Sequence, residues 1–216
     1  MNMEEKTLAL LSTAYLGPVQ YYTKLINFEQ VLIESDENFQ KQSYRNRCII
    51  LAANGTLPLT IPVTKDRPKV KTKEIEIDNT LDWQKQHWTS IESAYSSSPF
   101  FEFFMDEFRT FYEKKYKFLL DFNLEIQNYV LDQLEVSPTI KLTSEFIRKV
   151  PLNMVDYRET IHPKKRMQKK DKKFDPHFYY QVFGDKFGFV PNLSIIDLLF
   201  NEGANAENIL VQSISL

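Results

Sequence analysis

The 216-residue chain has few of the residues on which disulfides, metal sites and phosphate loops depend: one cysteine, three histidines and five glycines. A single cysteine excludes an internal disulfide bond, and three histidines without ligand spacing argue against a metal site. Five scattered glycines leave no glycine-rich loop that could hold a phosphate. The sequence therefore predicts neither a metal nor another cofactor.

Long hydrophobic runs and an excess of one charge are also absent. No run approaches the roughly 20 apolar residues that a membrane span requires, and the acidic first residues are unlike a signal peptide. The 27 Lys and Arg residues are balanced by 29 Asp and Glu residues, which gives no general attraction to nucleic acid. We expect a cytoplasmic protein with no membrane span and no nucleic-acid partner.

The chain does contain enough apolar material, 43% of its residues, for one domain with a sizeable core. Residues 7–34 predict a strand (7–12), a turn at Gly17 and Pro18, a helix and a second strand (30–34). Two parallel strands need such a crossover. In open α/β sheets the loop after the first strand lines the ligand crevice, so Tyr15 is a first candidate for the site wall.

The next part of the chain predicts an antiparallel hairpin. Asn54 and Gly55, which both tolerate positive φ, separate the apolar runs 48–53 and 57–63. Beyond them five cations occur at alternate positions: Lys65, Arg67, Lys69, Lys71 and Lys73. They predict a solvated, lysine-protected sheet edge; a groove for an anionic substrate and a nucleic-acid surface are the alternatives. A further strand is expected at residues 74–78.

Three amphipathic helices are predicted between residues 82 and 134. Asp82 is expected to cap the first helix, whose apolar face includes His87. Ser98 and Pro99 are expected to begin the second helix. Its phenylalanines would form either core or a dimer face, and the second reading would make the chain a homo-oligomer.

Together these elements predict an α/β fold with a last strand at residues 139–143. We expect a single domain over residues 1–216. It would contain a mixed central sheet, an N-terminal βαβ-like unit, an antiparallel hairpin and packed amphipathic helices.

Further candidate site residues come from three other segments. Arginine forks match phosphate and carboxylate oxygens, so residues 44–47, at the mouth of the hairpin, are expected to bind substrate. His87 is a candidate general base, although a core histidine bonded to backbone is the alternative. Asn192 precedes a short helix whose N-terminal amides favour anions, and Asp197 is a second catalytic candidate.

We expect these segments to meet in one pocket for a negatively charged small molecule such as a nucleotide sugar. His87 and Asp197 are predicted to be catalytic there. The predicted substrate-binding set is Tyr15, Tyr44, Arg45, Asn46, Arg47 and Asn192.

Residues 164–173, which we call the basic tract, contain seven Lys or Arg residues and one acid, Asp171. A run of like charges with little apolar area repels itself and gains little from ordering. We expect a mobile, solvated loop. A lid that closes over a negatively charged ligand is the alternative.

Several sequence blocks resemble the WbqC-like family of bacterial proteins, over nearly the whole chain. They are AYLGPVQYY, QKQSYRNRC followed by NGTLPLTIPV, WQKQHWTSIESAYSSSPFF, DYRETIHPKK and GFVPNLSIIDLLFNEG. The resemblance implies a transferase that acts on an activated sugar or amino sugar, by acyl or aminoacyl transfer, in bacterial surface-polysaccharide biosynthesis. A non-catalytic ligand-binding or assembly module for polysaccharide enzymes is the alternative.

Overall fold

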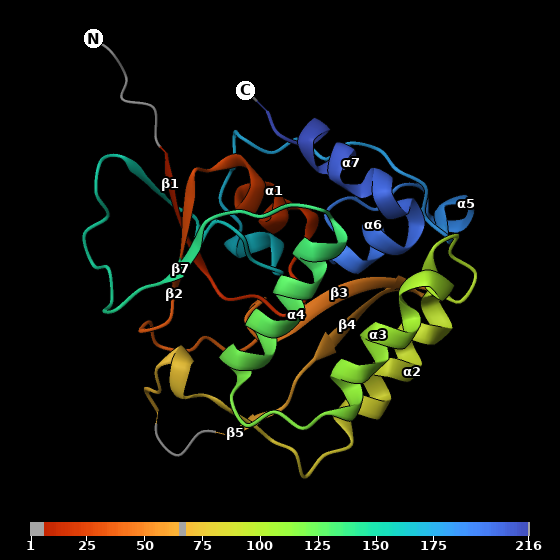
Figure 1. Cartoon of the computed structure of the whole chain (residues 1–216), viewed down its shortest axis with the longest axis horizontal. Helices are drawn as coiled ribbons and strands as arrows, with labels where there is room; N and C mark the ends of the chain where they lie inside the picture. The colour runs from red at the N-terminus through yellow and green to blue at the C-terminus, as the bar shows by residue number, and fades with distance from the viewer. Residues whose placement is uncertain (1–6, 65–67, 216) are drawn as a thin grey trace.

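A four-stranded parallel sheet in the order β7-β2-β1-β8 organises the N-terminal part of the fold (Figure 1). The structure is a computed structural model that describes residues 7–64 and 68–215. The strands are β1 (Leu8–Ser12), β2 (Gln30–Glu34), β7 (Ile140–Leu142) and β8 (Met154–Asp156). Residues 9–11 of β1 are buried, as expected for an inner parallel strand that is covered on both faces.

This sheet confirms the predicted α/β class and the opening βαβ unit. Helix α1 (Val19–Asn27) connects β1 to β2, and the strand predicted at residues 139–143 is β7. The sheet is parallel rather than mixed, because β1 pairs in parallel with both β2 and β8, and β2 with β7. The antiparallel pairs form two separate two-stranded sheets.

The predicted hairpin consists of β3 (Arg47–Ala52) and β4 (Gly55–Thr60). Gly55 adopts a φ of 106°, which its turn requires and which a side chain would disfavour. A second antiparallel pair joins β5 (Val63–Thr64) to β6 (Glu76–Ile77). Strand β6 is shorter than the predicted strand, because the 3-10 turn η1 (Thr72–Glu74) takes up its first residue.

The alternating cations do not act as one row. Lys65 and Arg67 lie outside the described residues, and Lys69 is exposed. Lys71 and Lys73 both bind the buried carboxylate of Asp36, with 2.8 Å between Lys73 Nζ and Asp36 Oδ2. These two lysines therefore hold the loop that follows β2.

The three predicted amphipathic helices are α2 (Trp83–Tyr95), α3 (Phe101–Glu113) and α4 (Leu119–Gln133). Asp82 occupies the N-cap position of α2, although its side chain makes no capping hydrogen bond. Helix α3 begins at Phe101 rather than at Ser98 or Pro99. The reason is local: the Phe101 N–H bonds to the Ser98 carbonyl at 3.3 Å, so residues 98–101 form a turn before the helix begins.

The C-terminal part is also helical. It contains α5 (Gly184–Phe187), α6 (Ile195–Glu202) and α7 (Ala206–Gln212), with 3-10 turns η2 (Lys165–Met167) and η3 (Gly203–Asn205). The Phe200 ring of α6 contacts four rings of α2 and α3 at centroid distances of 5.2 to 6.1 Å: Tyr95, Phe101, Phe104 and Phe108. Phe101, Phe104 and Phe108 of α3 therefore belong to the core, whereas Phe103 of the same helix is 76% exposed.

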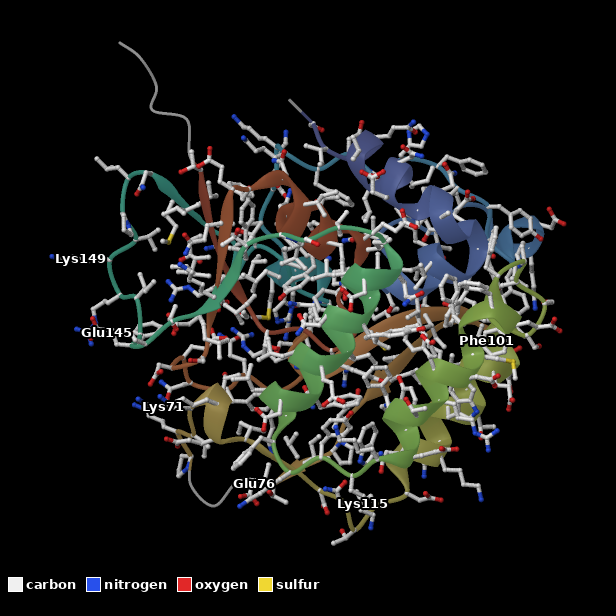
Figure 2. The ribbon with its side chains drawn as sticks, viewed as in Figure 1. Lys71, Glu76, Phe101, Lys115, Glu145 and Lys149 are labelled. Atoms are coloured by element: carbon white, nitrogen blue, oxygen red, sulfur yellow. The ribbon has the colours of Figure 1, made fainter. Side chains whose placement is uncertain are left out.

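The connection between β7 and β8 extends away from the sheet, with Glu145 and Lys149 at its outer side (Figure 2). It begins beside the carboxyl end of β2, because the Thr143 N–H bonds to the Ile33 carbonyl. No helix within the described residues is long and apolar enough to cross a membrane.

Candidate functional site

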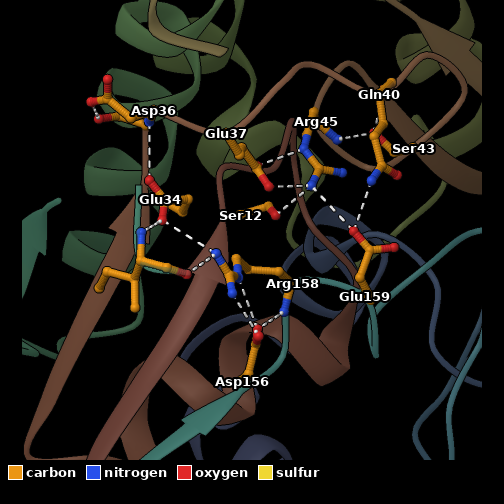
Figure 3. A network of polar contacts seen from close by, with 12 residues as sticks. Ser12, Glu34, Asp36, Glu37, Gln40, Ser43, Arg45, Asp156, Arg158 and Glu159 are labelled. Carbon is orange, nitrogen blue, oxygen red and sulfur yellow. Dashed lines mark hydrogen bonds and ion pairs between the residues drawn. The ribbon is translucent and has the colours of Figure 1, made fainter. Parts of the chain in front are cut away.

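Charged side chains gather where β1, β2 and β8 end (Figure 3). The chain passes from β1 to β2 on one side of β1, whereas β8 lies on the other side. The strand order therefore reverses between β1 and β8, and ligands of open α/β sheets bind outside the carboxyl ends of the strands at such a reversal. We call this place the crevice.

Arg45 is held at the crevice by a carboxylate. Its Nε and Nη2 atoms donate to the two oxygens of Glu37 at 2.7 and 2.6 Å, and Nη2 also donates to Ser12 Oγ at 2.7 Å. The side chain is buried. The arginine fork predicted to bind substrate is thus already bound to a protein carboxylate in the bidentate geometry that it prefers.

Arg158, just beyond β8, is the second arginine of the crevice. Its Nε and Nη2 atoms donate to Asp156 at 3.0 and 2.8 Å. Its Nη1 atom donates to the Ile147 carbonyl at 3.0 Å and to Glu34 at 3.3 Å. Glu34 is the last residue of β2 and is fully buried, so this network joins the ends of β2 and β8 to the β7–β8 connection.

Two pockets open at this edge of the sheet. One has a volume of about 10 Å³, room for a single water, and lies between residues 11–14, at the carboxyl end of β1, and the side chains of Tyr157, Arg158 and Ile161. The other has a volume of about 260 Å³, just below the range of roughly 300 to 1,000 Å³ that is usual for small-molecule sites. The larger pocket is lined by Glu37, Asn38, Gln40, Phe146, Asp156, Arg158 and Glu159.

Acidic groups outnumber basic ones in the crevice. Its two arginines pair with four carboxylates: Glu34, Glu37, Asp156 and Glu159. Glu159 is the least committed of these acids, because it lies 4.0 Å from Arg45, accepts one bond from Gln40 and has a side chain that is 44% exposed. The larger pocket therefore presents a partly free carboxylate to a ligand.

Tyr15 meets Tyr44 and His87 as expected, but within the core. Its hydroxyl lies 3.0 Å from His87 Nδ1 and 2.8 Å from the Tyr112 hydroxyl, and its N–H donates to the Tyr44 carbonyl at 2.9 Å. The Tyr15 and His87 rings stack with their centroids 5.7 Å apart. Burial lowers the pKa of His87 to about 4, so the imidazole is neutral at physiological pH.

Of residues 44–47, Tyr44 and Arg45 line the smaller pocket. The other two side chains bond to the last residue of β4 and to the residue that follows it. Asn46 Nδ2 donates to the Ile61 carbonyl at 2.8 Å, and Arg47 Nε donates to Thr60 Oγ1 at 2.8 Å.

Asn192 and Asp197 also have protein partners. Asn192 Oδ1 accepts the Gln20 N–H at 2.9 Å and so caps the start of α1. Asp197 accepts bonds from Tyr95, Tyr179 and Gln181 at 2.8 to 2.9 Å, and burial raises its pKa to about 6. The first N–H of α6, that of Ile195, already donates to the Gly17 carbonyl at 2.9 Å.

The structure therefore brings Tyr15, Tyr44 and His87 together in the buried core. Neither His87 nor Asp197 lines either pocket of the crevice. Their catalytic role, and the substrate-binding role of Asn46, Arg47 and Asn192, stay predictions.

The sequence analysis missed the residues on the far side of the crevice. Asp156 is the last residue of a three-residue strand that was not predicted, and Arg158 and Glu159 follow this strand. The available signal was the charged block DYRE after the short apolar run MV, because polar residues at the end of a parallel strand are candidates for a site.

The residues that the structure describes contain no group of three His, Cys, Asp or Glu side chains arranged to hold a metal ion. The chemistry of the crevice therefore has to be argued from its own acids, amides and arginines.

Comparison with known proteins gives one family and one relative. The model of the WbqC-like protein family matches residues 13–162. The chain is 28% identical to the uncharacterised protein Rv1507c of Mycobacterium tuberculosis over 230 residues, which cover 95% of this chain and 97% of that protein. No solved structure matches the chain.

Proposed function

Because the chain belongs to the WbqC-like protein family, we propose that it is a transferase that acts on an activated sugar or amino sugar in surface-polysaccharide biosynthesis. The resemblance implies acyl or aminoacyl transfer to the amino group. The crevice between β1 and β8 is the proposed site.

The composition of the larger pocket carries this proposal. Asn38 and Gln40 offer amides, and Glu37, Asp156 and Glu159 offer carboxylates; together they can bond to the hydroxyl groups of a sugar ring. Phe146, which is 47% exposed, adds an apolar surface against which a ring can pack. The excess of acids favours a substrate with a protonated amine over a neutral one.

Glu159 is the residue that we assign to the amine. Acyl transfer forms a bond between the amine nitrogen and the acyl carbon, and it breaks the bond between that carbon and the activating group, which leaves with the electron pair. The ammonium nitrogen loses two protons: one before the attack, which frees its electron pair, and one after the new bond has formed, which the leaving group takes up. Since Glu159 is half exposed and only weakly bound to Arg45, its carboxylate can both hold the ammonium group and accept the first proton.

Ligand-observed NMR with three methyl glycosides tests the binding step: an amino sugar, its N-acetyl derivative and the neutral parent sugar. We expect the amino sugar to bind best. Glu159→Gln should weaken its binding by about tenfold or more, since a bond to a charged group is worth roughly 1.5 to 3 kcal/mol. Glu113→Gln, on the exposed face of α3, is the matched control. Equal binding of all three glycosides, or an equal effect of both substitutions, would contradict the proposal.

A non-catalytic binding module is the second candidate, and one observation favours it. His87 and Asp197 are both buried and bonded to protein groups, so neither faces the crevice. Incubation of the protein with the amino glycoside and activated acyl donors, followed by mass spectrometry, separates the two functions. Binding without any acylated product would favour the module.

A further inference from the structure

A fully buried lysine lies behind the wall of the crevice. Lys24 of α1 has no exposed surface, and its Nζ atom is 5.2 Å from the centre of the Tyr157 ring. Tyr157 lines the smaller pocket, and so does Tyr21, one helical turn before Lys24. Lys24 is therefore separated from the crevice by little more than one aromatic ring.

The partner of Lys24 comes from the basic tract. Asp171 Oδ2 lies 2.7 Å from Lys24 Nζ and accepts a bond from Gln20 Nε2 at 2.9 Å. Lys24 also donates to the Lys173 carbonyl at 2.9 Å. Asp171 is the only acid of the tract, and residues 168–170, 172 and 173 around it are exposed. The tract is thus fastened to α1 through the Asp171 carboxylate and the Lys173 carbonyl.

This ion pair differs from those of the two arginines. Arg158 binds the terminal residues of β2 and β8, and Glu37, the partner of Arg45, is fixed by a bond from the Thr72 N–H to its carbonyl. Residues 157–183, which carry Asp171, contain no strand or α-helix and only the short turn η2. Asp171 can therefore leave its partner without disrupting the sheet or a helix.

We propose that Lys24 and Gln20 form a binding site for an oxyanion, a carboxylate or phosphate group, which Asp171 occupies in the free protein. A substrate oxyanion displaces Asp171 and releases the basic tract. Burial lowers the pKa of Lys24 while Asp171 raises it, as expected for a buried cation that needs an anionic partner. The inference rests on the proposed function in one respect only: the proposed function identifies the anion as the activating group of the acyl donor.

Calorimetric titration with pyrophosphate is the first test. An internal occupant blocks the site in part of the molecules. The apparent affinity is then the intrinsic affinity multiplied by the fraction of molecules in which the site is free. Asp171→Asn should therefore raise the affinity by about tenfold or more if the site is free in a tenth of the molecules or fewer. Glu125→Gln is the control: it removes the same charge from the exposed pair Lys114–Glu125, whose atoms are 2.8 Å apart. An equal gain in both variants would show only non-specific attraction and would overturn the proposal.

Lys24→Met supplies the second arm. It leaves Asp171 free to turn into solvent, so the variant should fold. It should lose pyrophosphate binding, whereas Lys114→Met should keep it. The double variant Lys24→Met, Asp171→Asn has the net charge of the wild type and no buried charge at this point. Retained binding in either Lys24 variant would place the anion on the tract or elsewhere and would refute the site.

Hydrogen exchange of the wild-type protein tests the release step without any substitution. Pyrophosphate should speed amide exchange in residues 164–173 and leave exchange in β1 unchanged. Slower exchange there would mean that the tract closes on the anion, which contradicts displacement of Asp171. These outcomes are independent of the amino-sugar test, because Glu159 and Lys24 are probed with different ligands.

Discussion

At the scale of single residues, the base His87 and the acid Asp197 are both buried. Burial shifts their pKa values in opposite directions. The pKa of His87 falls from 6.5 to about 4, and that of Asp197 rises from 3.8 to about 6. Folding changes the proton affinity of both groups, so both make stability depend on pH. Between pH 4 and 6 their effects oppose each other.

His87 should stabilise the protein above pH 6.5 and lose this contribution as the pH falls to about 4. In that range the unfolded chain takes up the proton before the folded one does. The pKa difference corresponds to roughly 3 kcal/mol. We expect the free energy of unfolding of the wild type, relative to His87→Gln, to rise by about that amount between pH 4 and 6.5. Urea unfolding at several pH values measures it, and a constant difference would contradict it.

Asp197 should show the opposite sign. Its folded form keeps a proton that the unfolded form has lost, so its contribution is present below pH 3.8 and is lost as the pH rises to about 6. The free energy of unfolding of the wild type, relative to Asp197→Asn, should fall by roughly 3 kcal/mol across this window. Asp106→Asn, on the exposed face of α3, is the control in the same urea experiment, and an equal slope for both variants would contradict the prediction.

At the scale of elements, Glu34 connects three parts of the sheet. It accepts bonds from Thr143 Oγ1 at 2.7 Å, from the Ile147 N–H at 2.9 Å and from Arg158 at 3.3 Å. Glu34→Gln turns an amide NH2 group toward other hydrogen-bond donors, and it leaves Arg158, whose side chain is 10% exposed, with one carboxylate fewer. We expect a loss of roughly 3 to 5 kcal/mol in urea unfolding, as for other broken buried ion pairs.

Glu125→Gln provides the comparison for this prediction, because its ion pair with Lys114 is exposed. Exposed pairs contribute about 0 to 1 kcal/mol. If Glu34→Gln costs no more than Glu125→Gln, the network at the strand ends does not hold the β7–β8 connection.

The elements that the sequence could predict are those with their own pattern. The strands β1 and β2, the hairpin and the helices α2 and α4 each carry a local periodicity or turn signal, and all of them form near the expected residues. Strand β8 has only three residues and exists because β1 offers a parallel partner. A segment of three residues is too short to show the alternating pattern of a strand, and its pairing with a distant strand cannot be recognised from its own sequence. The β8 side of the crevice was missed for this reason.

In the candidate site, too, contacts that follow from local patterns could be predicted, whereas contacts that depend on distant partners could not. The contact between Tyr15 and His87 could be predicted, since one follows the first strand and the other lies on an apolar helix face. The partners of Arg45 and Arg158 could not be predicted. An arginine near a strand end binds a ligand only if no carboxylate reaches it first, and that depends on the tertiary structure.

At the scale of the whole molecule, the segment after β1 connects the sheet to the helices. Tyr15 contacts His87 of α2 and Tyr112 of α3. Asn123 of α4 donates to the Arg45 carbonyl at 2.8 Å. Since these contacts are buried, separating the helices from the sheet would expose polar groups without partners, which costs free energy.

We therefore expect the chain to unfold as one domain. Both tryptophans, Trp83 and Trp88, lie on α2, so their fluorescence reports on the helices, while amide exchange of β1 reports on the sheet. Urea unfolding followed by fluorescence and native-state exchange of residues 9–11 should give the same free energy. Phe200→Ala, which empties the aromatic cluster, should lower both values equally by about 3 to 5 kcal/mol. A decrease seen by fluorescence alone would show that the helices and the sheet are two separate folding units.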